Sequence, residues 1–445
     1  ACIIVLDKEN ASARKGIFMV DASKGFIKDG NKNRLRSQDI HKIVDVFIKH
    51  KELNRYSRMV SFSELSTNDY NLNIPRYIDS STSEDLHDLS AHLSGGIPNA
   101  DIDALDTYWQ VFPKLRANLF KPAREGYSDS LVEARQVKTT ILNHDEFKAF
   151  AKTALALFTQ WKQQAGLKEI AVGDKPKVLI HRISESLLSG YVEADLLSQY
   201  DIYQILMDYW EELMQDDVYV LTQDGWAAGK QLRELVAKKG EKLKETPDLI
   251  INKAKYKAEL IPPTLLVKRY FQSEQTALEQ LQTKLDTATQ TLESFIDEHS
   301  GEEGVLVDAQ TDAGKISKAS VAARLKLAID EDEIKILSEC KQWIEAEAKA
   351  KKAVKDAQEK LDNQVFAKYP TLMEQECKTL VVDDKWLALL ESNIQAEIER
   401  VTQQLANRVK TLEERYAYPL PQLTDEVSEL SANVDEHLQR MGLVW

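Results

Sequence analysis

Two short apolar runs near the start of the chain constrain its fold more than any other feature. The first, ACIIVL at positions 1–6, is rich in β-branched residues and ends in Asp7-Lys8. The second, GIFMV at 16–20, also ends in an acidic residue, Asp21. Strands that are apolar on both faces are typical of a parallel sheet whose neighbours cover them. Because few such runs follow, we expect the last part of an α/β domain joined to a long C-terminal extension.

Residues 1–79 carry this α/β pattern. After the second strand, the Gly- and Asn-marked segment 26–35 predicts a polar loop, and the apolar spacing over 39–48 predicts a helix that packs one face on the sheet. Residues 56–61 predict another strand, and the segment up to Ile78 predicts an extended exit, because the residue before Pro75 avoids helix.

Residues 80–260 change to a mainly helical pattern. Amphipathic helices are predicted over 102–120, 147–161, 178–188 and 201–214, with their aromatic residues in the core. Val218-Tyr219-Val220-Leu221, followed by Asp224-Gly225, predicts a short strand and a turn.

Residues 261–445 predict long helices with narrow apolar stripes. One helix has a seam with alternating spacings of three and four, formed by Leu278, Leu281, Leu285, Ala288, Leu292 and Phe295. Others are predicted over 332–366 and 385–416, where Pro419 and Pro421 end the latter, and from Thr424 onward. Such stripes favour coiled-coil or bundle pairing, either within the chain or with a partner.

Composition limits the classes of protein that remain. The 445 residues carry a net charge of −14 and no apolar stretch of membrane-spanning length, and the three cysteines are widely separated. We therefore expect a cytoplasmic protein of two to four domains with reduced thiols and no metal site. An acidic chain lacks long-range attraction to phosphate, so a basic partner or a missing segment is expected to supply any contact with nucleic acid.

Familiar catalytic motifs are absent from the sequence. Residues 309–316 contain Gly314-Lys315 but lack the other residues of a phosphate loop, and Pro262-Pro263 is better explained as a helix start. The acid pairs Asp216-Asp217 and Asp383-Asp384 are expected to be solvated caps rather than metal ligands. We therefore predict no catalytic residue in this chain.

One polar segment follows the second strand, at the sheet edge where open α/β sheets bind ligands. Its members are candidates for DNA contact, because lysine and arginine reach phosphates and asparagine reads base edges: Asn31, Lys32, Asn33 and Arg34. An ordinary surface turn has the same composition.

Taken together, ACIIVLDK, GIFMVDAS, NKNRL, DIHKIVDVF, YSRMVS and above all DYNLNIPRYID resemble the modification subunit of type I restriction-modification systems, an adenine-specific DNA methyltransferase. The later LSGGIPNADIDALDTYW, MQDDVYVL, KTLVVDDKWL, ERYAYPLPQL and GLVW are similar to the C-terminal region of long family members. The resemblance implies the terminal strands of a Rossmann-like methyltransferase sheet, then a helical domain and a long-helix region.

The family transfers methyl from S-adenosylmethionine to the exocyclic amine of a flipped adenine. Its Asn-Pro-Pro-Phe motif is not in this sequence, so the resemblance implies a C-terminal portion that neither binds the cofactor nor methylates by itself. It also implies specificity and restriction subunits as partners, and contact with DNA through the complex. The final helix would bind the specificity subunit through Leu423, Val427, Leu430, Val434 and Leu438.

Two other classes compete with this interpretation. A non-enzymatic coiled-coil tethering protein fits the acidic charge and the missing motifs equally well. Such a protein does not require two parallel strands that lack neighbouring strands, however. An independent enzyme that uses acids of the helical domain is the weakest alternative, because no cluster of His, Asp and Glu can be recognised in the sequence.

Overall fold

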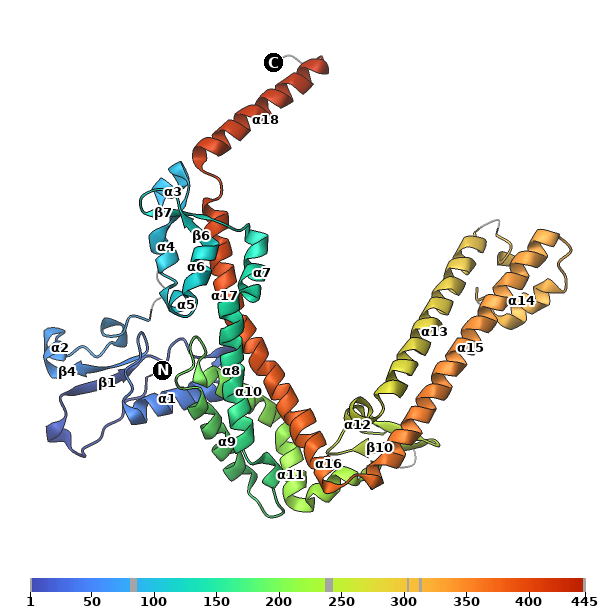
Figure 1. The fold of residues 1–445 in the computed structure, drawn as a ribbon, viewed down its shortest axis with the longest axis horizontal. Coiled ribbons are helices and arrows are strands. Elements are labelled where there is room, and N and C mark those ends of the chain that lie inside the picture. The colour runs from blue at the N-terminus through green and yellow to red at the C-terminus, as the bar shows by residue number, and fades with distance from the viewer. Residues whose placement is uncertain (1, 81–85, 237–242, 302–303, 312–313, 443–445) are drawn as a thin grey trace. The chain divides into compact units, whose positions relative to one another are not determined.

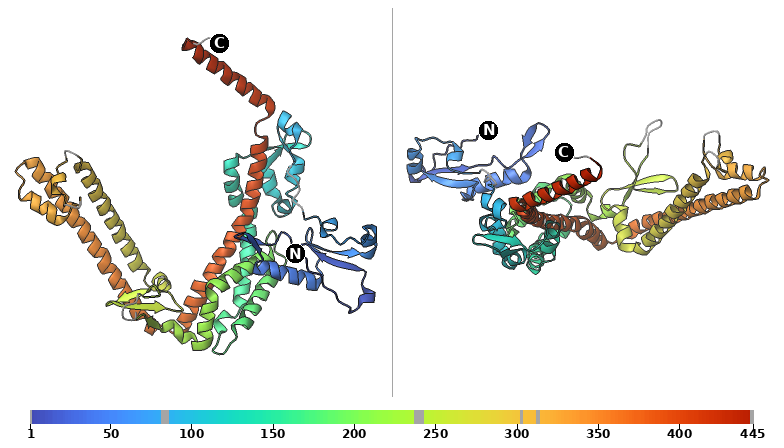
Figure 2. Two further views of the ribbon diagram at one scale, coloured as in Figure 1. Left: turned by 180° about the vertical axis from the view of Figure 1, so that it is seen from behind. Right: turned by 90° about the horizontal axis from the view of Figure 1, so that it is seen from above.

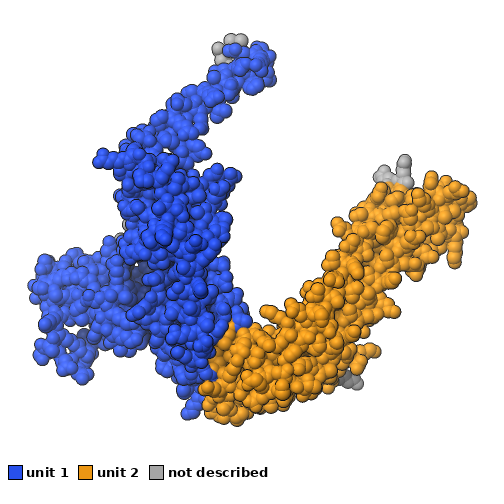
Figure 3. Space-filling model, viewed as in Figure 1, with its two compact units in different colours: residues 1–166, 175–215, 388–445 blue, residues 167–174, 216–387 orange. Residues whose placement is uncertain are grey.

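A computed structural model describes residues 2–80, 86–236, 243–301, 304–311 and 314–442. It is mainly helical, with small antiparallel sheets (Figure 1). Two compact units are formed, one by residues 1–166, 175–215 and 388–445 and the other by residues 167–174 and 216–387 (Figure 3). None of the described helices is long and apolar enough to cross a membrane.

The first unit begins with a small sheet lobe. Strand β1 (Gly16–Val20) pairs antiparallel with β4 (Ser57–Ser61), with Phe18 opposite Met59. Met19 and Val60 pack on one face of this sheet against residues of the segments that follow: Leu65, Ile74, Tyr77 and Ile78. The remaining elements of the lobe are β2 (Ile27–Asp29), β3 (Lys32–Arg34), α1 (Ser37–Lys49) and α2 (Phe62–Thr67).

The parallel strand predicted over residues 1–8 is wrong for the described structure. Residues 2–7 have no regular structure, and their apolar side chains are exposed, to 87% for Ile3 and 92% for Leu6. A doubly apolar strand needs paired strands beside it and layers on both faces, and the described residues provide neither. The predicted strands at 16–20 and 56–61 are confirmed as β1 and β4, but the prediction that the strand at 16–20 is parallel is wrong, because β1 pairs antiparallel with β4.

The predicted helix over 102–120 is broken into three short ones. Phe112 leaves the helical region before Pro113, whose ring cannot continue the preceding helix and instead starts the next one. The predicted aromatic core is confirmed, because Trp109 and Phe112 are buried. The elements here are α3 (Leu89–Ser94), β5 (Ile97–Pro98), α4 (Asn99–Asp103), α5 (Asp106–Val111), α6 (Pro113–Leu119), β6 (Phe120–Pro122) and β7 (Tyr127–Ser130).

The body of the first unit is a set of longer helices, which confirms most of the helical predictions. Helix α17 lies beside α7, α8 and α10 (Figure 1), and its predicted stripe, from Leu390 to Leu412, is buried. A π-helical segment, Trp210–Met214, continues α10. The helices are α7 (Ala134–Asn143), α8 (Asp145–Gln164), α9 (Pro176–Gly190), α10 (Gln199–Tyr209), α17 (Ala388–Tyr416) and α18 (Leu420–Arg440).

The second unit contains a three-stranded antiparallel sheet and a long helical pair. Its elements, with α11 beginning one residue before the unit, are α11 (Gln215–Asp224), β8 (Leu232–Glu234), β9 (Leu249–Ile251), β10 (Ala254–Ala258), α12 (Pro263–Tyr270), α13 (Gln272–His299), α14 (Lys318–Leu325), α15 (Glu331–Lys368) and α16 (Glu374–Lys378). The strand predicted over 218–221 is wrong. These residues lie in α11 and bury Val218 and Leu221 three positions apart, so helical packing outweighs the β preference of valine.

Helices α13 and α15 lie side by side in both views (Figure 2). The predicted seam of α13 faces this pairing: Leu292 is buried and the other five seam residues are partly buried. The seam is therefore covered by the chain's own α15, the intrachain alternative left open by the sequence.

A buried ion pair joins α11 to the π-helical segment Thr379–Leu387. The ammonium of Lys385 lies 2.8 Å from Asp217 Oδ1, and the indole N–H of Trp386 donates to Asp217 Oδ2 at 2.7 Å. Burial raises the pKa of Asp217, an effect that Lys385 and Trp386 oppose. Asp383 pairs with Lys168 and Asp384 with Arg269, so the prediction of solvated caps is wrong for these acids.

Replacing Lys385 by methionine is expected to destabilise the second unit by about 3–5 kcal/mol, because the buried carboxylate of Asp217 loses its cation. Urea unfolding followed by tryptophan fluorescence measures the loss. The matched control is Lys352→Met, at an exposed position of α15. A loss below about 1 kcal/mol would contradict the role of this ion pair.

Candidate functional site

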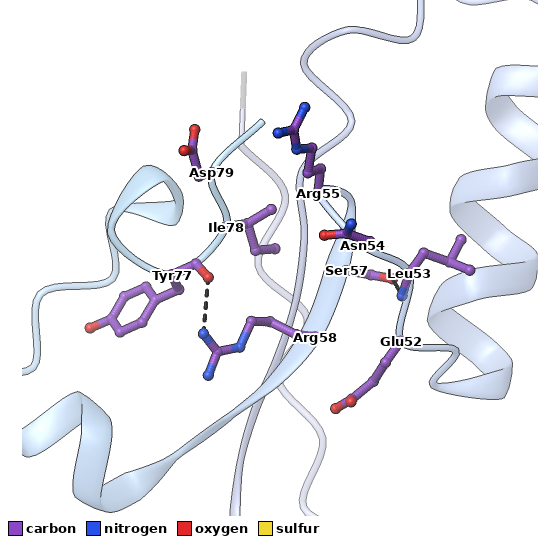
Figure 4. Close-up of a pocket in the computed structure, with 9 residues that line it drawn as sticks. All are labelled: Glu52, Leu53, Asn54, Arg55, Ser57, Arg58, Tyr77, Ile78 and Asp79. Atoms are coloured by element: carbon purple, nitrogen blue, oxygen red, sulfur yellow. Dashed lines mark hydrogen bonds between the residues drawn. The ribbon is translucent and has the colours of Figure 1, made fainter. Parts of the chain in front are cut away.

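A polar pocket of about 440 Å³ lies in the sheet lobe (Figure 4). It is formed where the turn before β4 meets the segment after Tyr77, and its walls carry charges of both signs. The lining residues are Glu52, Leu53, Asn54, Arg55, Ser57, Arg58, Tyr77, Ile78 and Asp79.

Arg58 fixes one wall of this pocket. Its guanidinium donates to the carbonyl of Tyr77 at 3.1 Å and to Glu64 at 2.7 Å. Glu52 accepts the backbone N–H of Met59 at 2.9 Å, so a side chain satisfies a donor on the free edge of β4. The close-up shows Arg55 and Asp79 on one side of the pocket, away from the guanidinium of Arg58 (Figure 4). The pocket can therefore bind polar groups, but its charges are mostly committed to holding the lobe together.

Asp21 directly follows β1 and is buried. Burial would raise the pKa of this carboxyl, but hydrogen bonds from Ser80 and Ser23 outweigh burial and lower it. Both carboxylate oxygens already accept hydrogen bonds, one from the Ser80 hydroxyl and one from the Ser23 backbone. Asp21 therefore has a structural role, because its hydrogen bonds hold Ser80 and Ser23 next to the end of β1.

The four candidate DNA contacts lie in a hairpin rather than in the predicted loop. Strands β2 and β3 pair across the two-residue turn Gly30-Asn31, with Lys28 opposite Asn33 and Asp29 opposite Lys32. All four candidates are exposed: Asn31, Lys32, Asn33 and Arg34. Asn33 accepts from the Lys28 ammonium at 2.8 Å, and Arg34 pairs with Asp29 at 3.3 Å. The structure therefore brings the candidates together on one ribbon.

Helix α1 turns its apolar side outward, contrary to the prediction that this side packs on the sheet. Its buried residues are Gln38, Asp39, Asp45 and Val46, three of them polar. Its exposed stripe consists of Ile40 (52%), Val44 (47%), Phe47 (37%) and Ile48 (69%). A helix that exposes such a stripe presents an interaction surface.

The inward side of α1 docks on α9 and α10 through polar contacts. The Tyr200 hydroxyl donates to Asp45 at 2.7 Å, and the Gln38 amide donates to Asp201 at 2.9 Å. The ring of His41 stacks on Tyr203 with centroids 4.6 Å apart. Sequence reasoning missed this contact, because its partners are about 160 positions apart and no local pattern joins them.

Asp45 is the anchor of this contact. Burial would raise the pKa of Asp45, but hydrogen bonds from Lys49, Lys51 and Tyr200 outweigh it and hold that pKa well below its usual value. A carboxyl whose pKa is lowered on folding stabilises the fold above its unfolded pKa, about 3.9, and this contribution is lost as the pH falls toward the folded value.

The five candidate partner-binding residues all lie on α18. Four are exposed, Leu423 (43%), Val427 (62%), Leu430 (63%) and Val434 (55%), and Leu438 is partly exposed. The helix begins at Leu420, four residues before the predicted start at Thr424, with Pro421 in its first turn. The stripe is therefore available to a partner along its length.

Other motifs from the sequence have structural explanations. Pro263 opens α12, as predicted. In the phosphate-loop near-miss, Ala309 is buried and Gln310 pairs with Ile316, while residues 312–313 lie outside the described residues. Within the described ranges, no three His, Cys, Asp or Glu side chains are grouped to hold a metal ion.

The lobe that holds the pocket, the hairpin and α1 lies in the part of the chain that a protein-family model matches. Residues 1–86 match the family of N-6 DNA methylases. The relatives include the type I restriction enzyme MjaVII methylase subunit of Methanocaldococcus jannaschii, 38% identical over 80 residues, 17% of this chain and 14% of the relative. The MpnII methylase subunit of Mycoplasma pneumoniae is 29% identical over 89 residues, 20% of this chain and 16% of the relative.

A third relative, the MjaVIII methylase subunit of M. jannaschii, is 34% identical over 80 residues, 17% of this chain and 14% of the relative. The chain thus spans only 14–16% of the length of these curated relatives. No solved structure matches the chain. The chain is therefore similar, over 80 to 89 residues, to type I methylase subunits.

Replacing Asp45 by asparagine is expected to lower the free energy of unfolding by about 1–3 kcal/mol at pH 7, because charge-assisted hydrogen bonds are lost. Urea titrations of both proteins at several pH values measure the difference, which should shrink below about pH 4, where the Asp45 carboxyl of the unfolded wild-type chain becomes protonated while that of the folded chain stays ionised. A difference that stays constant down to pH 2 would contradict this account.

Proposed function

We propose that this chain is the C-terminal portion of the modification subunit of a type I restriction-modification system. In the intact subunit, an adenine-specific DNA methyltransferase transfers methyl from S-adenosylmethionine to adenine N-6 in the cytoplasm. This portion assembles the subunits, and by itself it neither binds the cofactor nor methylates DNA. The match of residues 1–86 to N-6 DNA methylases supports the proposal.

The structural observation that best supports this proposal is the exposed apolar stripe of α1. A helix of 13 residues is about 20 Å long, whereas two paired strands offer a surface only about 10 Å wide. The lobe therefore leaves much of the apolar side of α1 uncovered, together with the free edge of β4. Helix α1 contacts β1, so further strands added to this two-stranded sheet would widen the surface on which the stripe Ile40, Val44, Phe47 and Ile48 could pack. A methyltransferase sheet supplied by a catalytic segment fits this surface.

The catalytic segment, and not this chain, would supply the residues that transfer the methyl group. The sequence contains no Asn-Pro-Pro-Phe, the motif that holds the target amine in the family. Asp21, the acid nearest the edge where ligands bind such sheets, has both oxygens committed to structural hydrogen bonds. In the intact subunit, α1 would instead support the catalytic sheet from one side and dock on α10 from the other.

Methyl transfer tests the first half of the proposal. With tritiated S-adenosylmethionine and a duplex that contains adenine, the 445-residue chain alone is expected to give no incorporation. Co-expression with a catalytic segment that contains the Asn-Pro-Pro-Phe motif should give transfer, and Val44→Asp with Ile48→Asp should abolish it by charging the docking stripe. The control is Ser66→Asp, an exposed position of α2. Incorporation by the chain alone would contradict the proposal.

Helix α18 carries the assembly role. Its stripe repeats at spacings of three and four from Leu423 to Leu438, which suits the seam of a helical bundle with the specificity subunit. Four of the five stripe residues are more than 40% exposed, so a partner helix could bury them without displacing other parts of the chain. The restriction subunit would join through the same complex.

Leu430→Glu with Val434→Glu is expected to abolish co-purification with the specificity subunit, because each change places a charge in the seam. Ser428→Glu with Ala432→Glu, on the other side of α18, is the control and should bind normally. Removal of the helix by truncation after Tyr416 should reproduce the loss. Normal binding by the seam variant would refute the assembly role of α18.

A further inference from the structure

The β2–β3 hairpin is a basic ribbon on an acidic protein. The segment from Lys24 to Arg34, which consists of the hairpin and the three residues before it, carries four cations, Lys24, Lys28, Lys32 and Arg34, against the single carboxylate of Asp29, a net charge of +3 where the whole chain has −14. All five charged side chains are exposed. Cations kept apart from neutralising acids create a local positive potential even on an acidic protein.

The pairing of the hairpin sorts these side chains onto two faces. Directly opposite residues of an antiparallel pair point to the same side. One face therefore carries Lys28 and Asn33, joined by a 2.8 Å hydrogen bond, and the other carries Asp29, Lys32 and Arg34. Among the described residues, the Lys32 ammonium has no ion-pair partner, and Arg34 meets only the exposed Asp29 at 3.3 Å.

The turn of the hairpin holds one more polar group. Gly30 has φ of +58°, the left-handed conformation that glycine adopts without strain, and it closes a two-residue turn with Asn31. The tight turn places the exposed Asn31 at the end of the ribbon. Its amide makes no side-chain hydrogen bond with the described residues, and an asparagine amide can pair with the N6 and N7 edge of adenine.

We propose that the β2–β3 ribbon is a contact surface for duplex DNA. Lys32 and Arg34 would neutralise backbone phosphates, and Asn31 would face the base edges. Two strands about 5 Å apart fit the B-form major groove, about 12 Å wide, whereas the major groove of A-form RNA is too narrow for side chains to read. The inference rests on the proposed function, since it assigns a substrate contact to the methylase-related lobe.

Salt-dependent binding of a fluorescent DNA duplex to the 445-residue chain tests this surface by anisotropy from 50 to 200 mM salt. Lys32→Gln with Arg34→Gln should weaken binding at least tenfold at 50 mM and reduce the slope of log K against log salt by about 1.8, since each lost phosphate contact removes about 0.9. Asn31→Ala should leave the slope unchanged and weaken binding less than the double variant.

The matched control is Lys349→Gln with Lys352→Gln, which removes the same charge from exposed positions of α15. It should change affinity less than twofold and leave the slope unaltered. Equal losses in both double variants, no binding by the wild-type chain at 50 mM salt, or tighter binding to single-stranded RNA would each overturn the inference. Assembly through α18 is measured without DNA, so such a result would leave the proposed function standing.

Discussion

Burial of one continuous face of α17 holds the first unit together. Over 29 residues, this helix buries a stripe that α7, α8 and α10 cover, and fully burying each such aliphatic side chain stabilises by about 1.5–3 kcal/mol. At its end, Tyr416 accepts the backbone N–H of Asp88 at 3.1 Å and donates to Asp101 at 3.3 Å. Segments more than 300 residues apart in sequence are thereby fixed in one core, on which the sheet lobe rests through α10.

The contact between lobe and body has a different character. It is built from Asp45, Tyr200, Gln38 and Asp201, with His41 stacked on Tyr203, so hydrogen bonds and ring contacts carry it rather than aliphatic packing. Polar contacts of this kind set orientation, because each bond requires a particular geometry, and they add less stability per contact than a core does. The apolar side of α1 is thereby left free for the partner surface proposed above.

Helices with strong apolar stripes could be predicted from the sequence because their burial is periodic. The stripe of α17 and the seam of α13 both lie where the spacing placed them. The predictions from sequence failed where a contact with a distant residue, or the lack of a neighbouring strand, determines the local structure. Valines at 218 and 220 continue a helix, residues 2–7 form no strand, and Asp217 meets Lys385 across 168 positions. The candidate DNA residues were found by composition, but their hairpin pairing was not, since a three-residue strand leaves too short a pattern.

The distribution of charge and apolar surface separates the tasks of the chain. The acidic body has little attraction for DNA, and the exposed apolar stripes on α1 of the lobe and on α18 suit protein partners. The basic β2–β3 ribbon lies within residues 1–86, which match the family of N-6 DNA methylases. A basic ribbon on that lobe would let the lobe approach a phosphate backbone, although the whole chain is acidic. In the function proposed above, the acidic assembly region and the basic substrate contact would therefore have complementary roles.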